Sequence, residues 1–140
     1  MLLSKLKNRL VILIPAYCAC LVDETVTIIN QPAAYWNGNL QAGREANPIG
    51  AALMRNHVSG IFLISFAWLI AIGVIGYWLP KQFVKTFALI VLIAHTSAAI
   101  SWITPHYGFW FSMAFIVFNS ALFVQLEKTT SNMLTKSPYN

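Results

Sequence analysis

Charged residues are scarce in this sequence. Only 9% of its 140 residues are Asp, Glu, Lys or Arg, and 58% are hydrophobic. Soluble domains carry about 25% charged residues. So few charges cannot cover the surface of a domain folded in water, so the composition excludes an ordinary soluble protein. Residues 1–140 have room for a single domain, and its natural solvent is lipid.

Cysteines are also few. Cys18 and Cys20 are the only two, and they lie two positions apart in an apolar stretch. Side chains two apart point to different sides of a helix, so this pair is poorly placed for a disulfide or for sharing a metal ion. We read both as small apolar side chains.

Four long apolar runs make up most of the sequence. Each is close to the ~20 residues with which a helix crosses a hydrocarbon core of about 30 Å. The runs show no two-residue alternation, and unpaired backbone is too costly in lipid, so helices are favoured over a barrel. The sequence therefore predicts an all-α fold, an integral membrane four-helix bundle. Its expected spans are residues 10–29, 61–79, 83–103 and 109–126.

The basic residues are unevenly distributed around these runs. With the N-terminus in the cytoplasm, only Arg44 and Arg55 lie on the outer side. The cytoplasmic side then holds Lys5, Lys7, Arg9, Lys81, Lys85, Lys128 and Lys136. Such an excess is typical of cytoplasmic loops. We expect a multi-pass protein of the cell inner membrane with both termini inside, whose net charge of +5 reflects topology and not nucleic-acid binding.

A long outer loop, residues 30–58, is expected between the first two spans. Tyr35 and Trp36 prefer the membrane interface and are predicted to rest there. Asn47 and Pro48 are typical of a helix start, with Asn as the N-cap and Pro as the first helical residue. A short interfacial helix should therefore lead into the second span.

The other connections are short. Residues 79–81 are predicted to form a tight cytoplasmic turn, and residues 104–108 a tight outer one. Both segments contain proline, which interrupts helical hydrogen bonding. Three uncharged polar residues lie within the spans and are expected to form hydrogen bonds between helices: Ser65, Ser112 and Asn119.

Two adjacent acids, Asp23 and Glu24, lie within the first run, in the outer third of the bilayer. A carboxylate inside a membrane costs roughly 2.5–3.5 kcal/mol, so the pair needs a reason. Asp23 shares a helix face with Thr27, whereas Glu24 points about 100° away and could reach outer water. Two readings stay open: a functional cluster, or a loop anchor that is protonated or salt-bridged to Arg44 or Arg55.

Three histidines lie on the outer side. His95 and Asp23 differ in depth by only a few ångströms at ~1.5 Å per residue, so they could pair across two helices. Alternatively, His95 forms a structural hydrogen bond without further chemistry. His57 and His106 lie at the outer ends of their spans. Haem ligation by His57 and His95 is disfavoured by a depth difference of ~12 Å, and no second feature supports His57 with His106.

Two short motifs follow one another in the first half of the chain, Asp23-x-x-x-Thr27 and Glu45-x-Asn47-Pro48. In these motifs and in its helix count, the chain resembles a family of small prokaryotic multi-pass membrane proteins of unknown function. The resemblance implies that Asp23, Thr27, Glu45 and Asn47 act as a unit. It implies no activity. The loop between the motifs is longer here than in that family.

Three functional readings follow, in order of preference. The first is an accessory or scaffold protein that works with partner membrane proteins or a second copy of itself. The second is a membrane-embedded enzyme or metal site at the outer face, with Asp23, Glu45 and His95 as candidate ligands. The third is an oligomeric proton-coupled transporter, because buried acids often mark ion paths. The sequence carries no catalytic signature and names no cofactor.

Overall fold

Four long helices make up most of the protein. The computed structural model describes the backbone of residues 2–135 and the side chains of residues 10–130. Within that part the four are α1 (Leu2–Ile29), α4 (Gly60–Trp78), α5 (Lys81–Tyr107) and α6 (Phe109–Thr135), and no strand occurs. All four are long and apolar enough to cross a membrane. The predicted all-α four-helix fold is confirmed.

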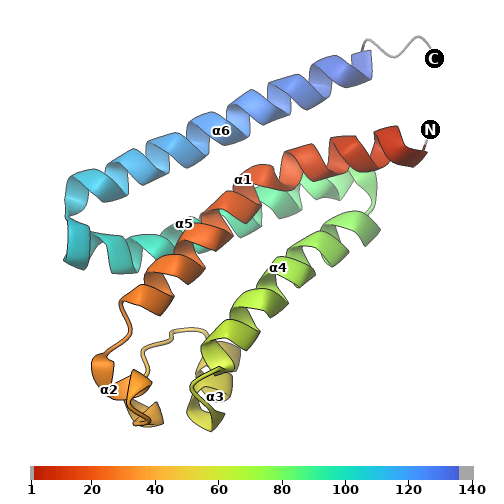
Figure 1. The fold of residues 1–140 in the computed structure, drawn as a ribbon. Coiled ribbons are helices and arrows are strands. Elements are labelled where there is room, and N and C mark those ends of the chain that lie inside the picture. The colour runs from red at the N-terminus through yellow and green to blue at the C-terminus, as the bar shows by residue number, and fades with distance from the viewer. Residues whose placement is uncertain (1, 136–140) are drawn as a thin grey trace.

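The central helix is α1. It packs against α4, α5 and α6, most extensively against α5, whereas α4 and α5 touch each other little. The start of α1 and the end of α6 lie at one end of the bundle, opposite α2 and α3 (Figure 1). This agrees with an even number of spans. Which end faces the cytoplasm stays a prediction, and Lys136, one of the residues behind it, lies outside the described residues.

The apolar core follows α1. Small residues allow close approach there, since Ala16, Ala19 and Ala88 are completely buried. In lipid, close packing of small residues holds helices together, because apolar surface gains little from leaving a hydrocarbon solvent. The largest core cluster joins all four spans and comprises Ile12, Leu13, Ala19, Cys20, Ile72, Val84, Ala88, Leu92 and Phe123.

The outer turn is shorter than predicted. Residues 104–108 do not form a loop, because α5 continues through Pro105 to Tyr107 and Gly108 alone connects it to α6. Proline in a last helical turn removes only one backbone hydrogen bond, so the helix tolerates it. Gly108 ends the helix at φ 94°, a conformation that favours glycine, with its N–H bonded to the Thr104 carbonyl at 3.0 Å.

One mid-membrane polar residue also departs from expectation. Asn119 donates to the carbonyl of Phe115 in its own helix at 2.9 Å and makes no bond to a neighbouring helix among the described residues. An i−4 carbonyl is always within reach of a short amide side chain, so it competes with more distant partners. Ser112 does bond between helices, 2.7 Å from the hydroxyl of Thr104 on α5.

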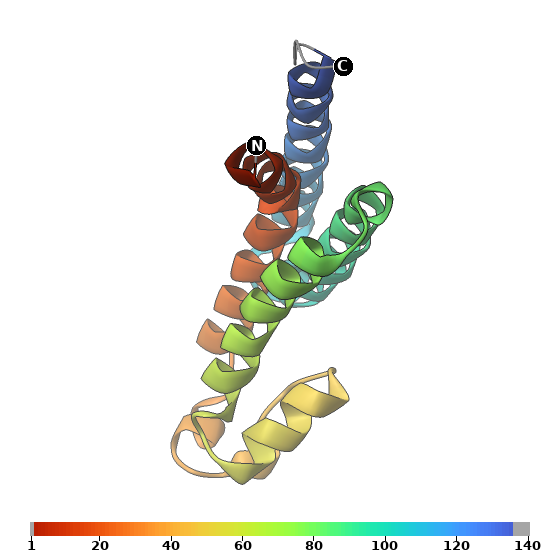
Figure 2. The same ribbon diagram turned by 90° about the vertical axis from the view of Figure 1, so that its right-hand side faces the viewer.

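The outer loop is folded. It contains α2 (Ala33–Trp36), the 3-10 helix η1 (Leu40–Ala42) and α3 (Pro48–Asn56). The helix start predicted at Asn47 and Pro48 is confirmed, because Oδ1 of Asn47 accepts the N–H of Ile49 at 3.0 Å. At the end opposite the termini, α3 lies against the start of α4 (Figure 2).

The side chain of Tyr35 is buried inside the folded loop, so it does not lie exposed at the membrane interface as predicted. Its side chain is completely buried against Met54 and Ile61, and its hydroxyl donates to the carbonyl of Val58 at 2.8 Å. The short helix α2 turns Tyr35 toward the apolar centre of the loop and leaves Trp36 partly exposed. Tyr35 therefore anchors the loop to the segment that enters α4.

A buried amide closes the loop over the end of α1. The side chain of Gln31 donates to the Arg44 carbonyl at 2.7 Å and accepts the Arg44 N–H at 2.8 Å. Both backbone groups of Arg44 are thus paired with the buried Gln31 amide, which would cost about 1–3 kcal/mol to bury unpaired. These two hydrogen bonds hold the segment after Arg44 above the end of α1.

Gly60 is required where α3 meets α4. A Cβ there would lie 2.2 Å from the carbonyl oxygen of Leu53, which is backbone and cannot move aside. We expect Gly60→Ala to lower the free energy of unfolding by about 1–3 kcal/mol, the usual cost of overpacking. Thermal unfolding in detergent, followed by circular dichroism, measures this loss.

Gly73→Ala is the matched control. Its Cβ would meet only the hydroxyl of Tyr17, the far end of a flexible side chain, at 2.5 Å. We expect a clearly smaller loss there. Equal losses in the two variants would contradict the requirement for glycine at Gly60.

Candidate functional site

A pocket of about 420 Å³ lies between α1, α4 and α5. It forms where α4 and α5 diverge, and the loop segment 45–47 lines the end of it that lies nearest the loop. Most of its wall is apolar, with aromatic surface from Trp68, Phe87 and Trp102. A concave apolar site with a few converging polar groups is the usual form of a binding site.

Three of the four acidic residues of the protein line this pocket. Asp23 and Glu24 come from α1, and Glu45 comes from the outer loop. The fourth, Glu127, pairs with Lys85 of α5 elsewhere in the bundle. Among the described residues that line the pocket there is no Lys or Arg. The ionisable carboxyl groups are therefore concentrated in this pocket, without a Lys or Arg in its described lining to balance them.

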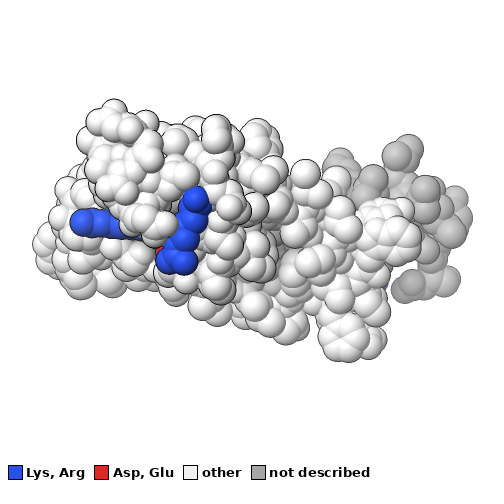
Figure 3. Space-filling view, turned by 90° about the horizontal axis from the view of Figure 1, so that it is seen from below, with Lys and Arg blue, Asp and Glu red and all other residues white. Residues whose placement is uncertain are grey.

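The outer arginines do not neutralise these acids. Across residues 10–130, neither Arg44 nor Arg55 forms a salt bridge, and both side chains are exposed. Seen from the α2–α3 end, basic side chains lie on the surface beside a small acidic area (Figure 3). The predicted salt-bridged anchor is therefore wrong, since exposed arginines keep their hydration instead.

Asp23 and His95 form the predicted pair. Oδ2 of Asp23 lies 2.8 Å from Nδ1 of His95, and each side chain is 12% exposed. One turn along α5, Ala99 is completely buried and lets the two helices approach. Trp68 of α4 meets the His95 ring edge-on, with ring centroids 6.0 Å apart. The imidazole is thus held between α1 and α4.

Glu24 turns inward and not toward the outer water, so its predicted direction is wrong. Its carboxylate accepts a hydrogen bond from Ser65 of α4, which confirms Ser65 as a partner between helices. The reason is the position of α1 between two neighbours. The face about 100° from Asp23 meets α4, while Asp23 itself meets α5.

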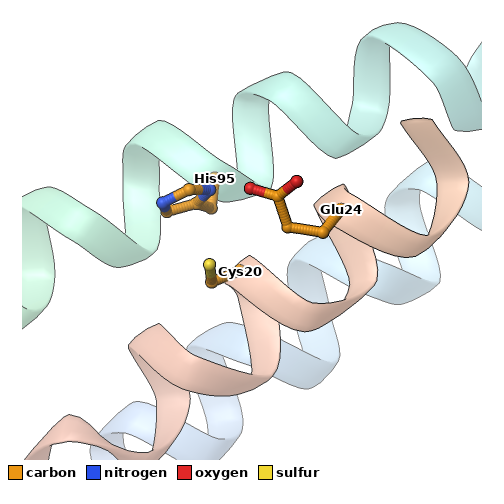
Figure 4. Close-up of side chains that lie close together, drawn as sticks. All are labelled: Cys20, Glu24 and His95. Atoms are coloured by element: carbon orange, nitrogen blue, oxygen red, sulfur yellow. The ribbon is translucent and has the colours of Figure 1, made fainter. Parts of the chain in front are cut away.

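Cys20 joins this cluster one helical turn below Glu24. Its Sγ, a carboxylate oxygen of Glu24 and a ring nitrogen of His95 lie within 4.8 Å of one another (Figure 4). Reading both cysteines as small apolar side chains misses this. The available signal was the four-residue spacing of Cys20 and Glu24, which places both on one helix face. Cys18 lies outside the group and is a free thiol.

Glu45 is held by the start of α3. Its Oε1 accepts the N–H of Asn47 at 2.6 Å, and Asn47 in turn caps α3. These local bonds occupy the N–H groups of Asn47 and Ile49 at the start of α3. Burial raises the pKa of the Glu45 carboxyl, opposed by the Asn47 N–H and reinforced by the nearby Asp23 carboxylate.

The remaining candidates lie outside the pocket. His57 ends α3, exposed, with Nδ1 2.8 Å from Oγ of Ser59. His106 is exposed in the last turn of α5, where Nδ1 bonds to the carbonyl of Trp102 at 2.8 Å. All three histidines lie toward the end of the bundle opposite the termini, but only His95 points into the bundle.

All four residues of the two motifs line this same pocket: Asp23, Thr27, Glu45 and Asn47. The folded loop brings the second motif over the first. Comparison with protein-family models, curated proteins and solved structures finds no match to this chain. Membership of the family that the motifs resemble therefore stays a prediction.

The raised pKa of Glu45 gives the loop a pH dependence. The folded protein holds the Glu45 proton more tightly than the unfolded chain does. The protonated Glu45 carboxyl therefore adds to the free energy of unfolding. This contribution is complete when the pH is below 4.5, the ordinary pKa of the group, and it is lost as the pH rises through the raised pKa of the folded protein. The amide of Glu45→Gln resembles the protonated carboxyl and does not titrate. We expect the melting temperature of this variant to fall less than that of the wild type as the pH is raised from 4.5 to neutrality.

Glu127→Gln is the control, because Glu127 lies apart from the pocket and pairs with Lys85. It should keep the wild-type slope in this pH window. Parallel profiles for wild type and Glu45→Gln would contradict the assignment to Glu45.

Proposed function

We propose that this multi-pass protein of the bacterial inner membrane binds a cation in the pocket at its outer side. The observation that carries the proposal is the unbalanced charge of the pocket, where Asp23, Glu24 and Glu45 converge without Lys or Arg. Carboxylates withdrawn from water are costly unless they are protonated or meet a cation. His95 is the one basic group in the described lining, and Asp23 already occupies it.

The shape and walls of the pocket support a ligand. At about 420 Å³ it has room for a hydrated ion or a small organic cation. Trp68 and Trp102 add aromatic faces, which attract cations through their ring electrons. A cluster that serves only to order the loop requires neither the volume nor the aromatic wall.

The cytoplasmic half favours a binding site over a transport path. There, α1 packs against α5 through residues such as Leu13, Val84 and Ala88, and the pocket wall that α4 contributes at Ile72 and Ile75 is apolar. A proton-coupled transporter needs polar groups or water along its whole path. The polar groups of this pocket instead gather toward the outer end, so we propose entry from that side.

An accessory role in a larger assembly is the second candidate function. It is favoured by α6, which carries several exposed large side chains: Phe109, Trp110, Phe111, Val117 and Phe118. Such a surface suits lipid, a partner membrane protein or a second copy. The convergence of both motifs on the pocket supports our inclusion of this chain in the prokaryotic family that it resembles.

Thermal unfolding with added cations tests the proposal. Purified, tag-free protein in detergent is heated with Na⁺, Ca²⁺, Mn²⁺, Zn²⁺ or choline. We expect at least one of them to raise the melting temperature, because a ligand at a hundred times its Kd stabilises the folded state by about 2.7 kcal/mol. Glu24→Gln should lose most of that shift.

Glu127→Gln again serves as the matched control, since it removes the one acid outside the pocket. It should respond as the wild type does. No shift with any of the five cations, or the same shift in all three proteins, would overturn cation binding and leave the accessory role as the better reading.

A further inference from the structure

We propose that the bound cation is a divalent ion of the zinc class, held by Cys20, Glu24 and His95. This inference rests on the proposed function and names its ligand. Cys20 and Glu24 extend from α1 toward His95 on α5, and their donor atoms lie within 4.8 Å of one another (Figure 4). Three donors from two tightly packed helices thus meet at one point.

The mixture of donors selects the ion. A thiolate, an imidazole and a carboxylate together suit Zn²⁺ and related borderline ions. Ca²⁺ and Mg²⁺ prefer shells made of oxygen alone, which Cys20 and His95 do not supply. The acids of the pocket therefore explain why a cation is attracted, and Cys20 with His95 explains which cation is retained.

The distances fit after a small adjustment. Zinc lies about 2.0–2.3 Å from its ligands, so tetrahedral donors are roughly 3.3–3.8 Å apart. The separation of up to 4.8 Å here closes by about an ångström of side-chain rotation. Glu24 and Cys20 lie on adjacent turns of the same helix, so both side chains approach His95 from one side.

Asp23 and Ser65 are positioning residues for this site. A metal-bound imidazole usually keeps a carboxylate on its other nitrogen, which fixes the ring and makes it a better ligand. Asp23 lies 2.8 Å from Nδ1 of His95 and is placed for that role. Ser65 in the same way holds the carboxylate of Glu24.

The arrangement replaces the ligand set expected from the sequence. Asp23 and Glu45 are already occupied, by His95 and by the Asn47 N–H. Cys20 is completely buried behind the pocket wall, whereas Glu24 and His95 line it. An ion bound by these three would have its fourth position toward the cavity, open to water or a small ligand.

Binding also moves a proton. A thiol coordinates as the thiolate, so the ion displaces the proton of Cys20 to solvent. Affinity should therefore fall as the pH is lowered. Ions held by carboxylates alone near neutrality would lack this release of about one proton per chain.

Cobalt absorption tests the site directly. Tag-free protein stripped of metal is titrated in detergent with Co²⁺, which gives visible bands and, when a thiolate binds, charge-transfer absorption in the near ultraviolet. We expect about one ion per chain and bleaching of the bands by Zn²⁺. Cys18→Ser is the matched control and should keep the full spectrum, because Cys18 lies outside the cluster.

Cys20→Ser and Cys20→Ala should both lose the charge-transfer absorption and bind Co²⁺ at least tenfold more weakly. Asp23→Asn should keep the absorption but weaken binding about 10–100-fold, as expected of a group behind a ligand. Thermal unfolding in EDTA establishes that each variant is folded before its spectrum is read. The Ala variant keeps the buried position apolar where Ser disturbs it.

Charge-transfer absorption that survives in both Cys20 variants, or that is lost in Cys18→Ser, would overturn the site. So would the absence of Co²⁺ and Zn²⁺ binding by the folded wild type. Suppose that the folded wild type bound neither Co²⁺ nor Zn²⁺, but that Ca²⁺ or choline raised its melting temperature and Glu24→Gln removed that rise. This inference would then fail while cation binding stood. If no cation raised the melting temperature, both would fail.

Discussion

The contact between Asp23 and His95 sets the arrangement of the site. It joins α1 to α5, the two helices that pack most extensively, and leaves each side chain only 12% exposed. Because hydrocarbon offers no alternative partner, such a pair fixes the rotation of each helix. Once Asp23 faces α5, the next residue, Glu24, must face α4, and Cys20 follows it on the same side.

The outer loop completes what the helices begin. Gln31 pairs with the backbone of Arg44, and Tyr35 is buried beneath the loop, so the segment that carries Glu45 lies above α1. A third carboxylate thereby joins two that are already withdrawn from water. The diverging helices α4 and α5 leave space beside them, and this space is what distinguishes a binding pocket from a simple polar anchor.

Prediction from the sequence succeeded where a local rule decided the outcome. Apolar runs gave the four helices, Asn47 and Pro48 gave the start of α3, and equal depths gave the Asp23–His95 pair. It failed where a choice among neighbours was needed. Tyr35 was assigned to the membrane interface and Glu24 to outer water, but the folded loop gave Tyr35 a buried partner at Val58 and α4 gave Glu24 a partner at Ser65.

The sequence by itself determined that the chain is helical, that four of its helices are apolar enough to cross a membrane, and that Asp23, Glu24 and His95 lie toward the same end of the bundle. These follow from hydrophobicity, length and rise per residue, which each segment carries alone. Only the tertiary structure decided that Cys20 stands beside His95 while His57 and His106 stand apart. Depth along a helix is a property of one segment, whereas direction around its axis depends on which helices surround it.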